Sequence, residues 1–214
     1  MIISIINPKG GVGKSTLATN LAVEFLKVHP TKILELDMQR TAYFWSRLRE
    51  QKGVQPPVDV ELVDNARAVS GVCAPYQGNQ DNILIADCGA LDTDFNRAAT
   101  GAADLVIVPC RPSQAEVFGL TRMCSILADL GKGGYILNAG AFPASKGKIN
   151  DLEEYVGTLD GLTVMSTIVR YRAAYQHAFG DGRSVTEYGR DAAASYEIRS
   201  LSEEIEEILL TGGK

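Results

Sequence analysis

The sequence lacks any apolar run close to the roughly 20 residues that a membrane-spanning helix requires. Its first residues, MIISIINPKGG, have neither the basic region nor the small-residue cleavage site of a signal peptide. The four cysteines lie far apart and form no CxxC pair, which favours buried thiols in a reducing cytosol over disulfides or a metal site. We therefore expect a cytoplasmic protein.

A basic excess is missing as well, because 21 Lys+Arg stand against 26 Asp+Glu and the formal net charge is −5. This balance excludes a protein coated with positive charge for nucleic acid, but it leaves room for a local basic patch. Hydrophobic residues make up 45% of the chain, so disorder and collagen-like structure are excluded too. At about 150 residues per domain, the length predicts one domain over residues 1–214.

Short apolar runs alternate along the chain with segments of helical periodicity. The apolar runs predict strands at 2–6, 33–36, 58–63, 83–86, 105–108, 135–137 and 162–169. The helical periodicity predicts helices at 15–28, 41–50, 93–102, 115–130 and 192–211. Segment 64–81 is rich in turn-forming residues, and we expect loops at 131–134 and 139–148. The alternation predicts a doubly wound, mostly parallel α/β sheet with helices on both faces.

The most specific motif, residues 8–16, reads PKGGVGKST and lies between the first predicted strand and the first predicted helix. Backbone N–H groups of such a glycine-rich turn converge on phosphate oxygens, and the helix N-terminus adds a partial charge of about +0.5 e. In a loop of this kind Lys14 reaches the β- and γ-phosphates of a nucleotide, and the Ser15 hydroxyl ligates Mg²⁺. We expect nucleotide binding by Lys9, Gly10, Gly11, Val12, Gly13, Lys14, Ser15 and Thr16.

This loop differs from the general phosphate-loop pattern, which has glycine where this chain has Pro8, and it carries a second lysine, Lys9, before a glycine pair. The run KGGVGKS resembles the deviant Walker A signature of the ParA/MinD family of ATPases, and the resemblance extends over almost the whole chain. The chain is most similar to the small ParA partition ATPases without an N-terminal helix-turn-helix. The resemblance implies a Mg²⁺-dependent ATPase that forms a nucleotide-sandwich dimer, in which Lys9 reaches the partner's phosphates.

The resemblance also implies roles for four residues that follow predicted strands. Asp37, in a segment similar to switch I of the family, orients or activates the attacking water and helps to hold Mg²⁺. Asp87 ends an apolar strand similar to Walker B and holds Mg²⁺, through water. Gly89 donates its backbone N–H to the γ-phosphate, and Asn138 recognises adenine.

Both switch segments depart from the family pattern. Glu35 and Met38 replace the usual residues around Asp37, and Cys88-Gly89-Ala90 stands where the family has Thr-Pro-Pro or a similar run. No glutamine occupies a catalytic position, which predicts slow hydrolysis with the nucleotide state serving as a timer.

The charge distribution bears on what an ATP-bound dimer would bind. Four arginines in segment 170–190 stand against Asp181 and Glu187, and Lys146 and Lys148 lie in a neighbouring segment without acids. This favours non-specific DNA binding in plasmid or chromosome partition, although ordinary solvated charges explain the pattern as well. Segment 191–214 carries six acids against Arg199 and Lys214, so an anionic bilayer would repel it, and membrane binding of the MinD kind is disfavoured.

Three other functions remain open at this point. Small relatives assist conjugative or T-DNA transfer, or position another cargo. A nucleotide-binding scaffold without hydrolysis is the third, and the intact Lys14, Ser15, Asp37 and Asp87 argue against it. For the ATPase we expect a homodimer with ATP, a small adaptor or stimulating protein as partner, and association with the nucleoid in the ATP-bound state.

Overall fold

The computed structural model describes residues 1–141 and 146–211, and a parallel β-sheet forms their centre. Its strands, within that part of the chain, are β1 (Ile2–Ile5), β2 (Thr31–Glu35), β3 (Asp59–Leu62), β4 (Ile83–Asp87), β5 (Leu105–Cys110), β6 (Gly134–Ala141) and β7 (Leu162–Arg170). The spatial order is β3-β2-β4-β1-β5-β6-β7, and every neighbouring pair is parallel. The predicted sheet is confirmed.

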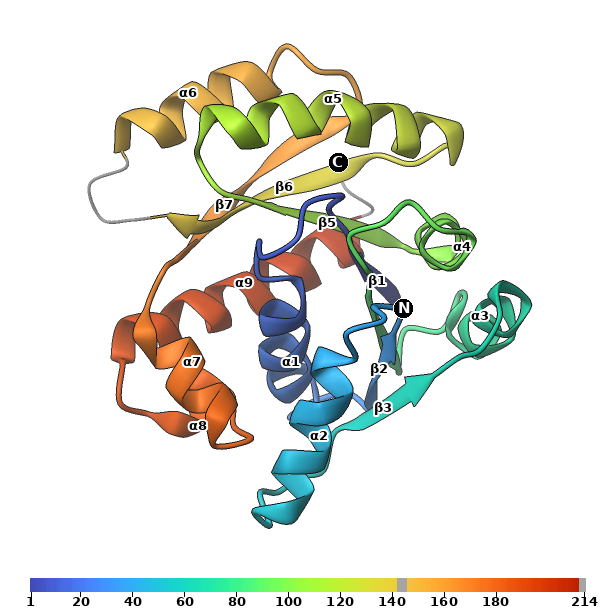
Figure 1. Cartoon of the computed structure of the whole chain (residues 1–214), viewed down its shortest axis with the longest axis vertical. Coiled ribbons are helices and arrows are strands. Elements are labelled where there is room, and N and C mark those ends of the chain that lie inside the picture. The colour runs from blue at the N-terminus through green and yellow to red at the C-terminus, as the bar shows by residue number, and fades with distance from the viewer. Residues whose placement is uncertain (142–145, 212–214) are drawn as a thin grey trace.

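Helices cover both faces of the sheet (Figure 1). One face packs against α1 (Lys14–Phe25), α2 (Thr41–Gln51), α7 (Ala173–Gly180), α8 (Val185–Tyr188) and α9 (Ala192–Thr211). The other packs against α3 (Ala66–Cys73), α4 (Asp94–Ala102), α5 (Gln114–Asp129) and α6 (Lys146–Val156). Each face of the sheet has its own hydrophobic core, and successive residues of a strand point to opposite faces. Ile3 and Ile5 of β1 therefore lie in the core on the α1 face, and Ile2 lies in the core on the α5 face.

The predicted loop at 139–148 is wrong, because Ala139–Ala141 continue β6 and residues 146–148 begin α6, while 142–145 lie outside the described residues. Gly140 has a φ of +72° and sits where the register between β6 and β7 shifts. A glycine that signals a turn in the sequence therefore accommodates a β-bulge in the strand. Likewise, the expected loop at 131–134 ends one residue early, since Gly134 already belongs to β6.

Segment 64–81 contains an element that the sequence did not reveal. Helix α3 begins after Asn65, whose side chain accepts a hydrogen bond from the Ala68 N–H at 2.9 Å, and a 3₁₀ turn at Ala74–Tyr76 follows it. Asn is a favoured N-cap residue, but it is equally common in turns, so composition alone left this segment without a helix.

The closing helix α9 has the predicted amphipathic arrangement. Ile198, Leu201 and Ile205 are fully buried against the α1 face of the sheet, and Ile208 packs beside them. In residues 1–141 and 146–211 there is no helix with the length and apolar content to cross a membrane.

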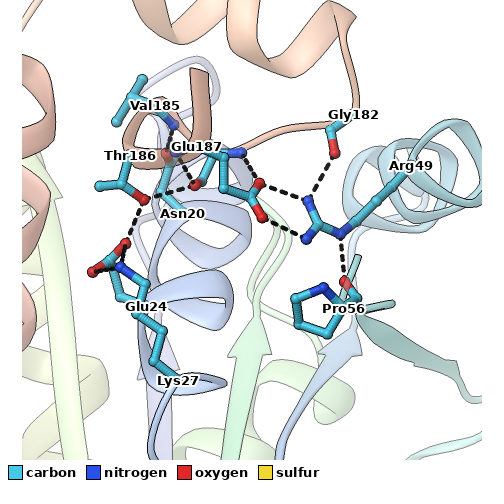
Figure 2. A network of polar contacts seen from close by, with 10 residues as sticks. Asn20, Glu24, Lys27, Arg49, Pro56, Gly182, Val185, Thr186 and Glu187 are labelled. Carbon is cyan, nitrogen blue, oxygen red and sulfur yellow. Dashed lines mark hydrogen bonds and ion pairs between the residues drawn. The ribbon is translucent and has the colours of Figure 1, made fainter. Parts of the chain in front are cut away.

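A buried arginine ties α2 to the turn that precedes α8 (Figure 2). The Arg49 guanidinium is fully buried and donates to the carbonyl oxygens of Pro56 and Gly182 at 2.8 and 3.0 Å. It also donates to both carboxylate oxygens of Glu187, at 2.7 and 2.6 Å. Burial by itself would raise the pKa of Glu187, but the bonds from Arg49 and from the Ser184 N–H outweigh it and lower the pKa.

The same region connects α8 to the helix that follows the glycine-rich loop. Asn20 of α1 accepts a hydrogen bond from the Val185 N–H at 2.8 Å, and its amide nitrogen donates to the Thr16 carbonyl oxygen at 2.7 Å. Thr186 donates to Glu24, also of α1 (Figure 2). Helices α1, α2 and α8 are therefore joined by polar contacts as well as by the apolar core.

We expect Glu187→Gln to lower the free energy of unfolding by about 3 kcal/mol, because it leaves the Arg49 charge buried without a carboxylate. Urea denaturation at neutral pH measures the loss. Glu50→Gln is a matched control, since it breaks an exposed ion pair with Arg47 at 2.6 Å and should lower the free energy of unfolding by less than about 1 kcal/mol.

The pH dependence of the Glu187→Gln effect has a definite sign. Because folding lowers the pKa of Glu187, its stabilising contribution is present above the unfolded value of about 4.3 and is lost as the pH falls through the lower folded value. The difference between wild type and Glu187→Gln should shrink in that acid range. Equal losses for Glu187→Gln and Glu50→Gln would contradict the assigned role of Arg49.

Candidate functional site

A cavity of about 570 Å³ lies where the loops after β1, β2 and β4 meet. The strand register brings these loops together, because Asp87 of β4 lies beside Ile5 of β1 and Glu35 of β2. The predicted site residues that line the cavity are Gly10, Gly11, Gly13, Lys14, Ser15, Thr16, Asp37 and Gly89. The sheet therefore gathers residues from three separate segments at its carboxyl edge, where ligands of such folds bind.

The backbone of the glycine-rich loop is shaped to receive an anion. Gly11 and Gly13 have φ angles of +74° and +96°, a region that residues with a side chain rarely adopt. Gly13 directly precedes α1, and within the described chain no side chain caps that helix. The N–H groups of its first turn are therefore left for a ligand, together with the positive end of the helix dipole.

Lys14 is buried inside this loop. Its ammonium donates to the carbonyl oxygens of Asn7 and Lys9 at 3.3 and 3.0 Å. Burial lowers the pKa of Lys14, while the nearby carboxylates of Asp87 and Asp37 oppose that shift. Lys9 is exposed and is not part of the cavity lining.

Asn7 fixes the start of the loop, a role that the sequence did not reveal. The Asn7 amide nitrogen donates to the Pro109 carbonyl oxygen at 2.8 Å, and its oxygen accepts from the Lys9 N–H at 2.8 Å. The phosphate loop is thereby tied to the end of β5.

Asp87 is fully buried beside the cavity, and neither of its carboxylate oxygens has a hydrogen-bond partner among the described residues. Burial raises the pKa of Asp87 and the charge of Glu35 raises it further, while Ser15 and Lys14 oppose the shift. A buried carboxylate without partners is costly unless a cation or its water completes the site. Ser15, Asp37 and Asp87 therefore fit a hard cation such as Mg²⁺.

That cation would depend on oxygen atoms from a ligand as well. No cluster of three or more His, Cys, Asp or Glu suited to a metal ion occurs within residues 1–141 and 146–211. Phosphate oxygens of a nucleotide would supply the remaining ligands, as is usual for Mg²⁺.

Glu35 organises the segment around Asp37, although in the sequence it stood out only as a departure from the family pattern. Its carboxylate is buried and accepts from the backbone N–H of Asp37 at 3.1 Å. It also accepts from the N–H groups of Ala42 and Tyr43, at 2.8 and 3.4 Å, and so caps α2. Burial raises the pKa of Glu35, and the three N–H donors oppose the shift. Glu35 thus fixes both the position of Asp37 and the start of α2.

A second cavity of about 200 Å³ lies beside the glycine-rich loop, on the side of β6 and β7. Val12, Arg111, Gly140 and Tyr175 are among the residues that line it. Arg111, which the sequence did not single out, donates to the Gly11 carbonyl oxygen from the end of β5. The Tyr175 hydroxyl is buried and has no hydrogen-bond partner among the described residues.

Asn138, the predicted adenine-recognition residue, is fully buried in β6. Neither of its side-chain amide atoms has a hydrogen-bond partner in the described part of the chain. It does not line the second cavity, but the next residues, Ala139 and Gly140, do. The role of Asn138 stays a prediction.

The arginines of segment 170–190 are less available than their sequence suggests. Arg170 and Arg172 donate to the buried carboxylate of Glu197 at 3.1 and 2.7 Å, and Arg172 lies 3.9 Å from Asp191. Asp191 directly follows the segment and Glu197 lies in α9, so counting charges within 170–190 missed both. Arg183 and Arg190 are exposed, and Arg190 lies over the Tyr188 ring at 5.1 Å.

We expect Glu35→Gln to lower the free energy of unfolding by about 1–2 kcal/mol, because an amide nitrogen then faces a backbone N–H that needs an acceptor. Since Asp37 loses its fixed position, affinity for a fluorescent ATP analogue should fall about fivefold. Asn65→Ala, which removes the N-cap of α3, is the control and should lower stability alone. Unchanged nucleotide affinity in Glu35→Gln would contradict this role.

Comparison with known proteins identifies the family of the chain. The family model of the CobQ/CobB/MinD/ParA nucleotide binding domain matches residues 3–185. Maintenance of carboxysome distribution protein A from Halothiobacillus neapolitanus is 24% identical over 208 residues, covering 95% of each chain. Protein ParA of Rhizobium radiobacter is 27% identical over 117 residues, covering 54% of this chain and 50% of that protein.

Among solved structures, apo McdA from Cyanothece superposes with a TM-score of 0.73 at 19% identity, covering 95% of this chain and 98% of that one. At this identity the likeness shows the shared fold. The family match, which extends over most of the chain, shows more: this protein belongs to the CobQ/CobB/MinD/ParA family of nucleotide-binding domains.

Proposed function

We propose that this chain is a slow, Mg²⁺-dependent ATPase whose ATP-bound form is a dimer, and that the ATPase cycle positions a cargo in the cell. One observation carries the ATPase proposal. The Lys14 ammonium and the unpaired Asp87 carboxylate lie next to the glycine-rich loop and the uncapped start of α1. Together these groups suit the phosphates and the cation of a nucleotide.

Different residues around the cavity bind the phosphates, hold the cation and orient the attacking water. The loop N–H groups and Lys14 bind the phosphates, and Ser15, Asp37 and Asp87 hold Mg²⁺ directly or through water. Bound Mg²⁺ neutralises phosphate charge. Asp37 is half-buried at the cavity wall, and its Oδ1 accepts from the Gln39 N–H at 3.0 Å. From that position its carboxylate orients the attacking water.

A second copy of the chain would cover the mouth of the cavity. Met38 and Leu91 line it and are 89% and 70% exposed, so apolar surface borders a polar site. Lys9 is exposed on the same loop and supplies positive charge to the partner's phosphates. ATP then acts as the bridge between protomers, and hydrolysis dissolves the dimer.

We expect Lys9→Ala to bind ATP with little change but to lose ATP-dependent dimerisation or hydrolysis. Lys14→Ala is the matched comparison and should lose nucleotide binding itself, since it removes the buried ammonium from the loop. Equilibrium titration with a fluorescent ATP analogue measures binding, and light scattering with Mg-ATP measures dimerisation. Normal dimerisation and hydrolysis in Lys9→Ala would overturn the trans-acting lysine.

Positioning of a protein cargo is the form of this function that the relatives support best. One relative is named for maintaining carboxysome distribution and covers 95% of the chain. DNA partition is the second candidate, because the likeness to a ParA protein extends over 117 residues. In both, a small adaptor would link cargo to ATPase, and co-purification with Mg-ATP would identify it.

We propose that the ATP-bound dimer binds DNA without sequence preference, through Arg183 and Arg190, and that this DNA supports the positioning of the cargo.

We expect DNA affinity to require ATP and to fall with salt, with a slope of log affinity against log salt of about −0.9 per phosphate neutralised. Replacing Arg183 and Arg190 by alanine should reduce that slope by about 1 for each arginine. Arg170→Gln is the control and should change the slope less than either alanine substitution, because the Arg170 guanidinium is already paired with Glu197. ATP-dependent DNA binding that ignores salt would contradict the proposal.

A further inference from the structure

One buried side chain holds the segment that follows β4. Asn96, near the start of α4, is 1% exposed. Its Oδ1 accepts from the Gly89 N–H at 3.2 Å, while its Nδ2 donates to the carbonyl oxygens of Gly89 and Leu91, at 3.0 and 2.6 Å. A single amide therefore engages both the N–H and the C=O group of Gly89.

This segment also forms a wall of the cavity. Gly89, Leu91 and Asn96 all line it. A Cβ placed on Gly89 would lie 3.5 Å from both the Asp37 Cα and the Leu36 carbonyl oxygen, so the Gly89 backbone passes directly beside Asp37. Asn96 thus holds Gly89 between α4 and the segment that carries the proposed water-orienting carboxylate.

We propose that Asn96 is a positioning residue that makes the site distinguish ATP from ADP. The inference rests on the proposed ATPase function and deepens it. Asn96 occupies the Gly89 N–H, which is the donor expected to bind a γ-phosphate. ATP takes this donor from the neutral amide oxygen, because a charged acceptor forms a bond about twice as strong. ADP has no γ-phosphate and leaves the bond between Gly89 and Asn96 in place.

The Asn96 Nδ2 group carries the effect of this exchange to Leu91. When Gly89 turns its N–H to the phosphate, the bond from Nδ2 to the Leu91 carbonyl oxygen still ties the segment to α4. A change at the γ-phosphate is therefore transmitted to Leu91, whose exposed side chain lies at the mouth of the cavity. The position of Leu91, on the surface that a second copy would cover, therefore depends on whether ATP or ADP is bound.

Asn96→Asp tests the exchange. Its carboxylate still accepts from the Gly89 N–H, now as a charged acceptor, but it cannot donate to Gly89 or Leu91. We expect the affinity for Mg-ATP relative to Mg-ADP to fall about tenfold, because the γ-phosphate must displace an acceptor that is also charged. Competition titrations of ATP and ADP against a fluorescent nucleotide give the two dissociation constants.

Thr93→Asp is the matched control. Thr93 lines the same cavity and caps α4 by accepting from the Asn96 N–H at 3.2 Å, and aspartate preserves such a cap. Thr93→Asp adds the same negative charge as Asn96→Asp, but residue 93 makes no hydrogen bond to Gly89. An equal fall of the ATP-to-ADP preference in both variants would overturn the inference, since charge alone would then explain it. If the wild type bound neither nucleotide, the proposed function would fail instead.

NMR of the wild type keeps the inference testable if Asn96→Asp does not fold. The Gly89 backbone amide and the Asn96 side-chain amide should shift with a non-hydrolysable ATP analogue and Mg²⁺, and should stay in place with Mg-ADP. Identical spectra for these groups with both nucleotides would overturn the role of Asn96.

Discussion

The buried carboxylate of Asp87 is the constraint on which the site depends. It ends β4, an inner strand of the sheet, has no hydrogen-bond partner among the described residues, and lies within the electrostatic reach of Lys14 and Glu35. Such a group destabilises the folded chain unless a ligand completes it. The sheet keeps it there because the residues of β4 that precede it, from Ile83 to Ala86, are fully buried. In the ATPase proposed above, stability would be exchanged for affinity toward Mg²⁺ and the phosphates of the nucleotide.

Much of the fold follows from patterns that are local in sequence. Buried strands of a parallel sheet appear as short apolar runs, and the glycine-rich loop has a spacing that few other structures use. The sequence therefore predicted the sheet, helices α1, α2, α4, α5 and α9, and part of the lining of the main cavity, namely the glycine-rich loop, Asp37 and Gly89. It misjudged 139–148, because the glycine at position 140 marks a bulge inside a strand instead of a turn.

The polar contacts that organise the site could not be predicted in the same way. Glu35 caps α2, Asn96 holds Gly89, and Glu197 pairs with Arg170, across segments that only the fold brings together. A buried amide or carboxylate looks like any surface residue in the sequence, since its partners are backbone groups several residues away or side chains on other elements. Charge counts within segment 170–190 missed the pairing of Arg170 and Arg172 with Glu197 for the same reason.

Helix α2 is anchored near both of its ends. Glu35 holds the first turn through the Ala42 and Tyr43 N–H groups, and Arg49 joins the last turn to Glu187 (Figure 2). The Glu35 carboxylate that holds the first turn of α2 also accepts from the Asp37 N–H, so one side chain fixes both the helix and the segment that leads into it. Polar contacts therefore connect Asp37 at the cavity wall, through α2, to α8.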